Sequence, residues 1–206
     1  MGVAKDERAA LCDLFTVVGP DAPTLCGAWT TRDLAAHLVI RERRLDASAG
    51  ILVKPLAGYL DKVTRGYLAK PWDELVTLVR TGPPVWSPFK PLDELINTTE
   101  YYVHHEDVRR ATPGWEPRPP AARRDAAIWT TLGRMGKVLL RKSPVGIALR
   151  TPEGRTATVK KGPDPVTLVA EPGEILLFAF GRDESRVEFE GPDASISAVK
   201  NLSRGF

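Results

Sequence analysis

The first two thirds of the chain carry apolar residues three and four positions apart, the spacing of one helix face. Glycine and proline interrupt this pattern at Gly19-Pro20 and Gly82-Pro83. Thr30 and Asp33 resemble a capping box at a helix start, and Pro91 is a favourable first helical residue. The predicted helices cover about residues 4–18, 30–49, 57–80 (a looser region), 91–112 and 121–141.

The period changes after Ser143-Pro144, where apolar and polar residues begin to alternate. Two alternating segments flank Pro152-Glu-Gly and predict a hairpin. The expected order is strands at 145–150, 156–160 and 166–169, a helix at 172–180, a strand at 186–190 and a helix at 193–201. The sequence therefore predicts an α+β protein. We expect residues 1–143 to form an up-and-down four-helix bundle and residues 144–206 to form a small α+β domain.

Composition narrows the class of protein without naming a function. The 206 residues are 43% hydrophobic and 27% charged, which excludes a disordered chain. The net charge of +3 is too small to argue for a nucleic-acid partner. The chain opens without an apolar signal, and no run approaches the ~18 apolar residues that span a bilayer. We expect a cytoplasmic protein without nucleic-acid or membrane partners, in which Cys12 and Cys26 are reduced and pack as small apolar side chains.

Only three histidines are available as nitrogen ligands for a transition metal, and His37 and His104 lie in helical patterns. Glu100 and His104 are four residues apart, so they share one face of a helix whose neighbouring positions are mostly apolar. Burying both side chains is costly unless a partner such as a divalent ion satisfies them. His37 lies on an apolar stripe of an earlier helix. Together His37, Glu100 and His104 would supply three ligands and leave a fourth position open, as in catalytic zinc sites.

Each of these residues also has an ordinary structural interpretation. A Glu and a His four apart commonly form an exposed ion pair, and a single helical histidine is commonly a partly buried core residue. His105 points about 100° away from His104 and suits a surface or outer-shell position better than a ligand. Asp107 either orients His104 as an outer-shell partner or pairs with Arg110. The sequence leaves these alternatives open.

The order of two motifs resembles a known superfamily. The segment Trp29–Leu38, which contains His37, precedes the pattern Glu100-x-x-x-His104-x-x-Asp107. This combination resembles the DinB-like superfamily of metal-binding four-helix bundles. Within it, the chain more closely resembles the mycothiol-dependent maleylpyruvate isomerase group, which is common in actinobacteria and adds a small α+β domain. The resemblance covers nearly the whole chain, although the segment Leu176–Arg182 matches more weakly than the N-terminal motifs.

The resemblance implies a function as well as a fold. It places a metal, usually zinc, on His37, Glu100 and His104, and it implies that the ion binds the thiol of mycothiol or a similar cofactor. It also implies that Arg182 faces the site, where an arginine suits a substrate carboxylate. The expected activity is S-transfer to, or isomerisation of, a small electrophile. Superfamily members occur as monomers or dimers, so a homodimer is compatible with it.

Two other functions remain open at this point. The ion could activate water, which would make the protein a hydrolase. The protein could also bind a metal or a small ligand without turnover, because no general base is evident beyond the candidate ligands. The segment 113–120 and the run His104-His105-Glu106 indicate a separate subgroup, whose substrate the sequence does not name.

Overall fold

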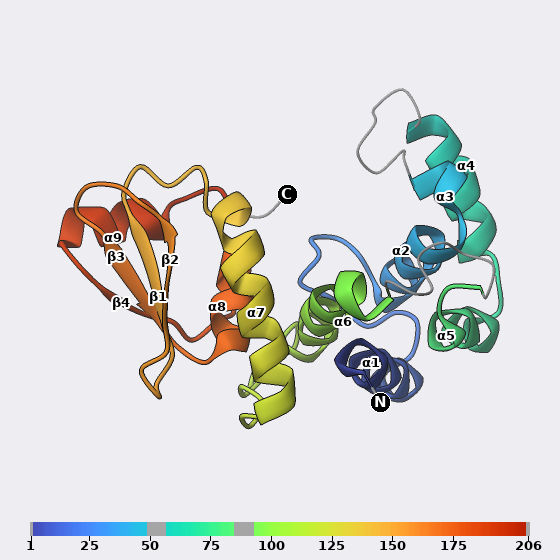
Figure 1. The fold of residues 1–206 in the computed structure, drawn as a ribbon. Helices are drawn as coiled ribbons and strands as arrows, with labels where there is room; N and C mark the ends of the chain where they lie inside the picture. Colours follow the sequence, from blue (N-terminus) through green and yellow to red (C-terminus); the bar gives the residue numbers. More distant parts are fainter. Residues whose placement is uncertain (1, 49–56, 85–92, 205–206) are drawn as a thin grey trace. The chain divides into compact units, whose positions relative to one another are not determined.

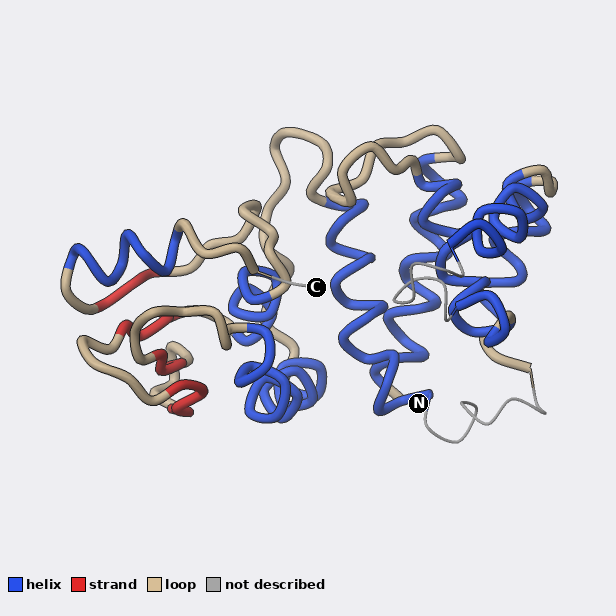
Figure 2. The backbone as a smooth tube through the Cα atoms, turned by 90° about the horizontal axis from the view of Figure 1, so that it is seen from above, coloured by secondary structure: helices blue, strands red, loops and turns tan. Residues whose placement is uncertain are grey.

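Helices make up the first half of the chain, and a small sheet with three helices makes up the second (Figure 1). The computed structural model describes residues 2–48, 57–84 and 93–204. The chain divides into two compact units, Met1–Trp115 and Glu116–Phe206. Figure 2 shows that, within the described ranges, all strands belong to the second unit. The predicted α+β class and the order of helical and mixed regions are confirmed.

The N-terminal unit holds the helices on which the candidate site lies. α1 packs against α5 and α6, while α2 packs against α4 and α5. Apolar residues of α1, α2, α5 and α6 share a core, whose fully buried members include Phe15, Leu34, Leu38 and Tyr101, and a smaller cluster joins α2 to α3 and α4. The helix bounds are α1 (Val3–Val18), α2 (Thr31–Arg43), α3 (Leu45–Ser48), α4 (Ala57–Leu68), α5 (Trp72–Thr81) and α6 (Asp93–Arg109).

Two of the predicted helices are divided in the structure. The second ends at Arg43, because the backbone of Arg44 leaves the helical region at φ −126° and ψ 69°, and α3 follows. The region 57–80 forms α4 and α5, which are separated just before Pro71, as proline requires. The predicted helix start at Pro91 lies outside the described residues.

The start of α2 is the predicted capping box. The Thr30 backbone N–H donates to Asp33 Oδ2 at 2.9 Å, and the Asp33 N–H donates to Thr30 Oγ1 at 3.4 Å. Thr31 adds a hydroxyl bond to the carbonyl of Gly19 at the end of α1. The two bonds of the capping box satisfy N–H groups that the first helical turn leaves unpaired, and the Thr31 hydroxyl satisfies a carbonyl at the end of α1. They also determine where the helix begins, and hence which face of it carries His37.

The C-terminal unit is a four-stranded mixed sheet with helices packed on it. The strand order is β2-β1-β3-β4; the β1–β3 pair is parallel and the other two pairs are antiparallel. Alternate residues of β1 and β3 are buried, and Leu149 lies in register with Leu168. The bounds are α7 (Ala122–Leu139), β1 (Ile147–Arg150), β2 (Thr156–Lys160), β3 (Val166–Val169), α8 (Pro172–Ala179), β4 (Glu188–Glu190) and α9 (Asp193–Lys200).

Helix α7 belongs with the sheet, whereas the sequence placed it in the helical bundle with a boundary at 143. The structural division falls between Trp115 and Glu116, and α7 packs on α8 and β2. The close approach depends on Gly136, where an added Cβ would lie 2.8 Å from a methyl group of Val159. An amphipathic pattern shows that a helix has a buried face but does not identify the surface that covers it.

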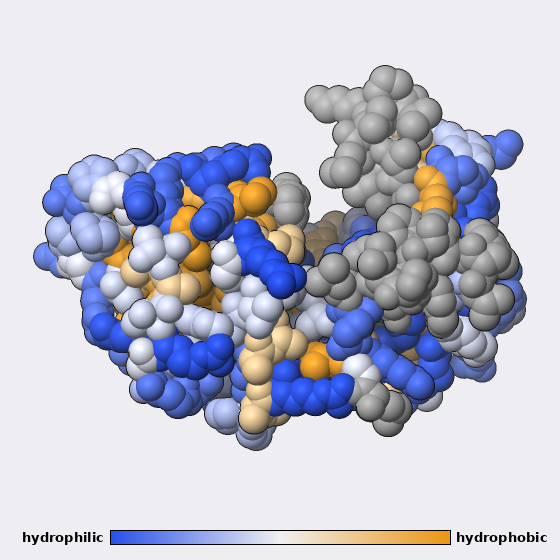
Figure 3. Space-filling model, viewed as in Figure 1, coloured by the Kyte–Doolittle hydropathy of each residue, from blue (hydrophilic) through white to orange (hydrophobic). Residues whose placement is uncertain are grey.

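Among the described residues, none of the helices combines the length and the apolar character needed to cross a membrane. In the view of Figure 3, the surface of the C-terminal unit is mainly hydrophilic, with apolar residues in small patches. Large apolar side chains that are exposed, such as Val17 and Val138, are scattered, as is normal for folded domains.

Two glycines of α7 test the packing of this helix on the sheet. Gly133 is exposed with no neighbour near its missing Cβ, so Gly133→Ala should stabilise the protein by about 0.5–1 kcal/mol through helix propensity. Gly136→Ala gains the same propensity but pushes against Val159, and overpacking of this kind costs about 1–3 kcal/mol. Urea unfolding should therefore rank Gly133→Ala above wild type and Gly136→Ala below it. Equal stabilisation by both substitutions would contradict the packing.

Candidate metal centre

Three polar side chains from two helices meet inside the N-terminal unit. His37 lies in the middle of α2, and Glu100 and His104 lie one turn apart on α6. The same carboxylate oxygen, Glu100 Oε1, is 3.5 Å from His37 Nε2 and 3.3 Å from His104 Nε2. The three side chains are 12–20% exposed. The structure therefore brings together the three residues that the sequence proposed as ligands.

The spacing of these atoms fits a tetrahedral ion. Zinc binds nitrogen and oxygen at about 2.0–2.1 Å, so neighbouring ligand atoms in a tetrahedral site lie about 3.3 Å apart. The distances of 3.3 and 3.5 Å match this value, and all three ligand atoms lie within 4.8 Å of one another. Two imidazoles and one carboxylate with a fourth position open form a donor set typical of catalytic zinc.

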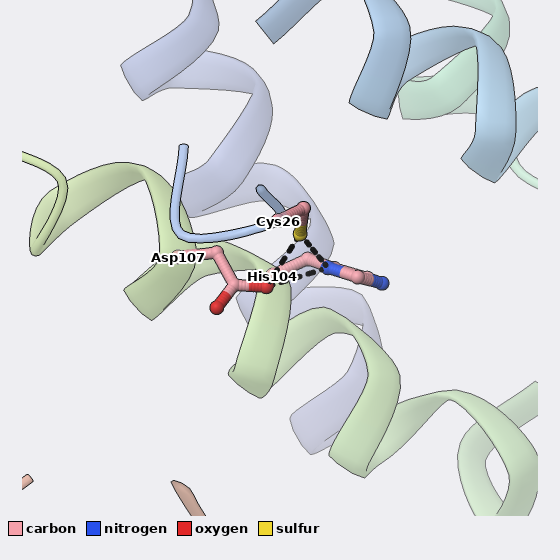
Figure 4. A group of neighbouring side chains, drawn as sticks. All are labelled: Cys26, His104 and Asp107. Carbon is pink, nitrogen blue, oxygen red and sulfur yellow. Dashed lines mark hydrogen bonds and ion pairs between the residues drawn. The ribbon is translucent and has the colours of Figure 1, made fainter. Parts of the chain in front are cut away.

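A second group with metal-ligating atoms uses the other nitrogen of the same histidine (Figure 4). Asp107 Oδ2 is 2.9 Å from His104 Nδ1 and 3.1 Å from Cys26 Sγ, and the sulfur is 3.7 Å from Nδ1. The two distances to the carboxylate are hydrogen-bond lengths, shorter than the spacing of ligands around an ion. We therefore interpret this group as support for His104, in which Nδ1 and the thiol donate to Asp107 and Nε2 faces Glu100.

The loop between α1 and α2 carries Cys26 to this position. The backbone N–H of Leu25 donates to the carbonyl of Asp107 at 3.0 Å, which ties the loop directly to α6. Inside the loop, Thr24 Oγ1 accepts from the N–H of Cys26 and donates to the carbonyl of Trp29. Cys26 also packs against the core, as the sequence predicted, but its sulfur takes part in the polar group.

The remaining sequence candidates fall into three positions. His105 is buried, and its Nδ1 lies 3.1 Å from Glu7 on α1, so it links α1 to α6 rather than adding a ligand atom to either group. Asp107 contacts His104, the position proposed for an outer-shell partner. Arg182 follows α8 in the C-terminal unit and donates to the carbonyl of Phe180, and its role at the site stays a prediction.

Burial raises the pKa of the Cys12 thiol to about 12, consistent with a structural cysteine.

Arg41 is a site residue that sequence reasoning missed. It lies one turn after His37 on α2, and its Nε is 3.3 Å from Glu100 Oε1. Its Nη1 donates to the side-chain oxygen of Asn97 on α6. The four-residue spacing from His37 was the available signal, but an arginine in the last turn of a helix is common for electrostatic reasons alone.

The electrostatics of the centre hold His104 and Glu100 in opposite charge states. Burial disfavours protonated His104, but hydrogen bonds to Asp107, Cys26 and Glu100 outweigh it and hold the pKa of His104 well above its usual range. Burial likewise disfavours ionised Glu100, but hydrogen bonds from His104 and His37 and the charge of Arg41 keep the pKa of Glu100 well below its usual range. Without an ion, the proton on His104 Nε2 thus lies between His104 and Glu100.

A pocket of about 400 Å³ opens beside His37 within the N-terminal unit. Its wall combines apolar side chains with two carboxylates and a hydroxyl: Trp29, Asp33, His37, Ile40, Leu60, Asp61 and Thr64. The Trp29 and His37 rings lie against each other, with centroids 5.2 Å apart. Because a candidate ligand forms part of the wall, a small molecule in this pocket lies next to the ion position.

Comparisons with known proteins identify the fold. No protein-family model and no curated protein sequence match the chain. Two solved structures match over 91% of this chain and 90% of theirs, at 13% identity. They are the mycothiol-dependent maleylpyruvate isomerase, with a TM-score of 0.61, and a histidine-to-alanine variant of it, with a TM-score of 0.63. The chain therefore has the fold of this isomerase, and the fold that the motif resemblance implied is confirmed.

The charge states predict how the stability of the metal-free protein depends on pH. The raised pKa of His104 contributes stability that is complete below the usual value of 6.5 and is lost as pH rises through the folded pKa. The lowered pKa of Glu100 contributes stability that is complete above 4.5 and is lost as pH falls through the folded pKa. Both contributions are complete only between pH 4.5 and 6.5.

Urea unfolding with a chelator present measures this effect. The loss of stability in His104→Gln should be largest between pH 4.5 and 6.5 and should shrink above that range. Glu100→Gln should show its largest loss in the same range, which provides a second variant if His104→Gln folds poorly. A loss that grows with rising pH would contradict the assigned charge states.

Proposed function

We propose that this protein is a metal-dependent enzyme that activates a low-molecular-weight thiol. In this proposal His37, Glu100 and His104 hold a divalent ion, zinc by preference, and the thiol cofactor is mycothiol or a similar molecule. The enzyme adds the thiolate to a small electrophile and releases the conjugate, or it isomerises the electrophile by adding the thiolate and then eliminating it. The observation that carries the proposal is the approach of two imidazole Nε2 atoms to one carboxylate oxygen, at the spacing of metal ligands.

The side chains around the candidate ligands suit this chemistry. A bound ion lowers the pKa of a coordinated thiol and so makes the thiolate available at neutral pH. Asp107 accepts the Nδ1 proton of His104, which leaves Nε2 as the atom that faces the ion. The pocket beside His37 provides space for the thiol and for the substrate. The protein needs no nucleophilic cysteine of its own, because the cofactor supplies the sulfur.

The comparison supports the choice of cofactor class. The two matched structures are described as mycothiol-dependent, and their fold extends over nearly the whole chain. At 13% identity the comparison carries the fold only, so we name the substrate by its class, a small electrophile. We also propose, from the motif resemblance, that Arg182 binds a carboxylate of that substrate. The partners in this proposal are small molecules or a second copy of the chain.

Metal analysis of protein purified without chelators tests the first half of the proposal. The wild type should hold one equivalent of a divalent metal. His37→Ala, Glu100→Ala and His104→Ala should each lose it, because each removes one of three protein ligands. His105→Gln is the matched control, since it changes the adjacent histidine and should keep the metal. Metal retained by all three ligand variants would contradict the site.

Thiol binding tests the second half. In cobalt-substituted protein, coordination of a thiolate produces a sulfur-to-metal charge-transfer band, so adding mycothiol should generate that band. With an electrophile present, wild-type protein should then form the thiol conjugate or the isomer, and His37→Ala should not. Turnover without any thiol would indicate that the ion activates water instead. Bound metal with neither a thiolate band nor turnover would contradict an enzymatic role for the thiol.

A further inference from the structure

A buried carboxylate, that of Glu42, is connected to the candidate metal centre through two other side chains. Glu42 follows Arg41 on α2 and is 4% exposed. Its Oε1 accepts three hydrogen bonds: from Arg8 on α1 at 2.7 Å, from Asn97 on α6 at 2.8 Å and from Tyr101 on α6 at 2.9 Å. Three donors from two other helices fix the position of this carboxylate.

Asn97 connects this buried carboxylate to Arg41. It is 2% exposed, its amide NH₂ donates to Glu42, and its side-chain oxygen accepts from Arg41 Nη1. A carboxylate can only accept and a guanidinium can only donate, so the two partners admit a single orientation of the amide. Asn97 therefore places an acceptor at one defined point beside Arg41.

Arg41 completes the connection to the metal centre. One edge of its planar guanidinium is held by Asn97, and Nε on the other side lies 3.3 Å from Glu100 Oε1. Because the guanidinium is rigid and planar, the bond to Asn97 also determines the direction of the Nε–H. The order of contacts is thus Glu42, Asn97, Arg41 and Glu100, which we name the positioning chain.

The positioning chain should matter because a carboxylate ligand can rotate. Replacing partners that orient a metal ligand typically lowers metal affinity about 10–100-fold. The charge of Arg41 alone would act in the opposite direction, since a guanidinium repels a nearby divalent cation. The sign of the change in metal affinity therefore separates orientation of Glu100 from simple electrostatics.

We propose that Arg41 is a positioning residue for the candidate metal ligand Glu100, and that Asn97 and Glu42 hold Arg41 in place. The inference rests on the proposed metal site and adds to it a set of residues that contribute no ligand atom. It assigns a reason for burying the Glu42 carboxylate and the Asn97 amide next to one another, an arrangement that apolar side chains would otherwise replace at little cost.

The test measures metal affinity by competition with a chromophoric chelator, together with the visible spectrum of the cobalt form. Arg41→Met should weaken metal binding by about 10-fold or more and alter the cobalt bands, which report ligand geometry. Asn97→Ala keeps every charge and every ligand, and it should weaken binding in the same direction. The double variant should lose less than the product of the two single losses, because both substitutions break one chain.

Arg44→Met is the matched control. It removes a positive charge three residues after Arg41, from a partly exposed arginine that pairs with Asp46, and it should leave affinity and spectrum unchanged. Circular dichroism and thermal midpoints of the metal-free proteins report folding separately. If Asn97→Ala does not fold, Arg41→Lys replaces it: the ammonium keeps the charge but lacks the planar two-edged geometry, so binding should still weaken.

The outcomes separate this inference from the proposed function. Wild-type protein that binds no divalent ion would overturn both. Wild-type protein that binds the ion, with Arg41→Met binding equally well or more tightly and with unchanged cobalt bands, would overturn the positioning role alone. Loss of affinity in Arg41→Met with none in Asn97→Ala would show that Arg41 acts without the chain behind it, and would overturn the chain.

Discussion

The meeting of His37, Glu100 and His104 at a single carboxylate oxygen is the constraint around which the N-terminal unit is arranged. Polar groups removed from water cost free energy unless they find partners, and here two imidazoles and a carboxylate converge between α2 and α6. Neighbouring side chains contact each of the three groups. Asp107 lies on one side of His104, Arg41 lies beside Glu100, and Trp29 lies against the ring of His37.

His104 separates two roles through its two ring nitrogens. Nε2 faces the carboxylate and the candidate ion position, whereas Nδ1 faces Asp107 and the Cys26 sulfur. The spacing favours the Nε2 group, because Asp107 lies at the short distances of 2.9 and 3.1 Å from Nδ1 and the Cys26 sulfur, whereas the contacts of Glu100 at 3.3 and 3.5 Å also match the spacing of metal ligands. The loop from α1 to α2 thereby belongs to the centre, although it contributes no ligand atom in this arrangement.

The sequence predicted the features that depend on spacing within one helix. The four residues from Glu100 to His104 and the three from Thr30 to Asp33 determine shared faces and caps, and both are present in the structure. It did not predict the contacts that join different helices. Arg41, Asn97 and Glu42 meet only because side chains of α2 reach α6 in the folded unit, and no local pattern encodes that approach. The helix α7 was assigned to the bundle for the same reason.

The most direct measurement is anomalous X-ray diffraction at the zinc absorption edge from crystals of the zinc-loaded protein. The account predicts one strong peak at bonding distance, about 2.0–2.2 Å, from His37 Nε2, His104 Nε2 and a Glu100 oxygen. Asp107 should remain hydrogen-bonded to Nδ1. A peak on the opposite side of the ring, bonded to Nδ1, Cys26 and Asp107, would contradict the assignment, as would crystals that bind no zinc at this place.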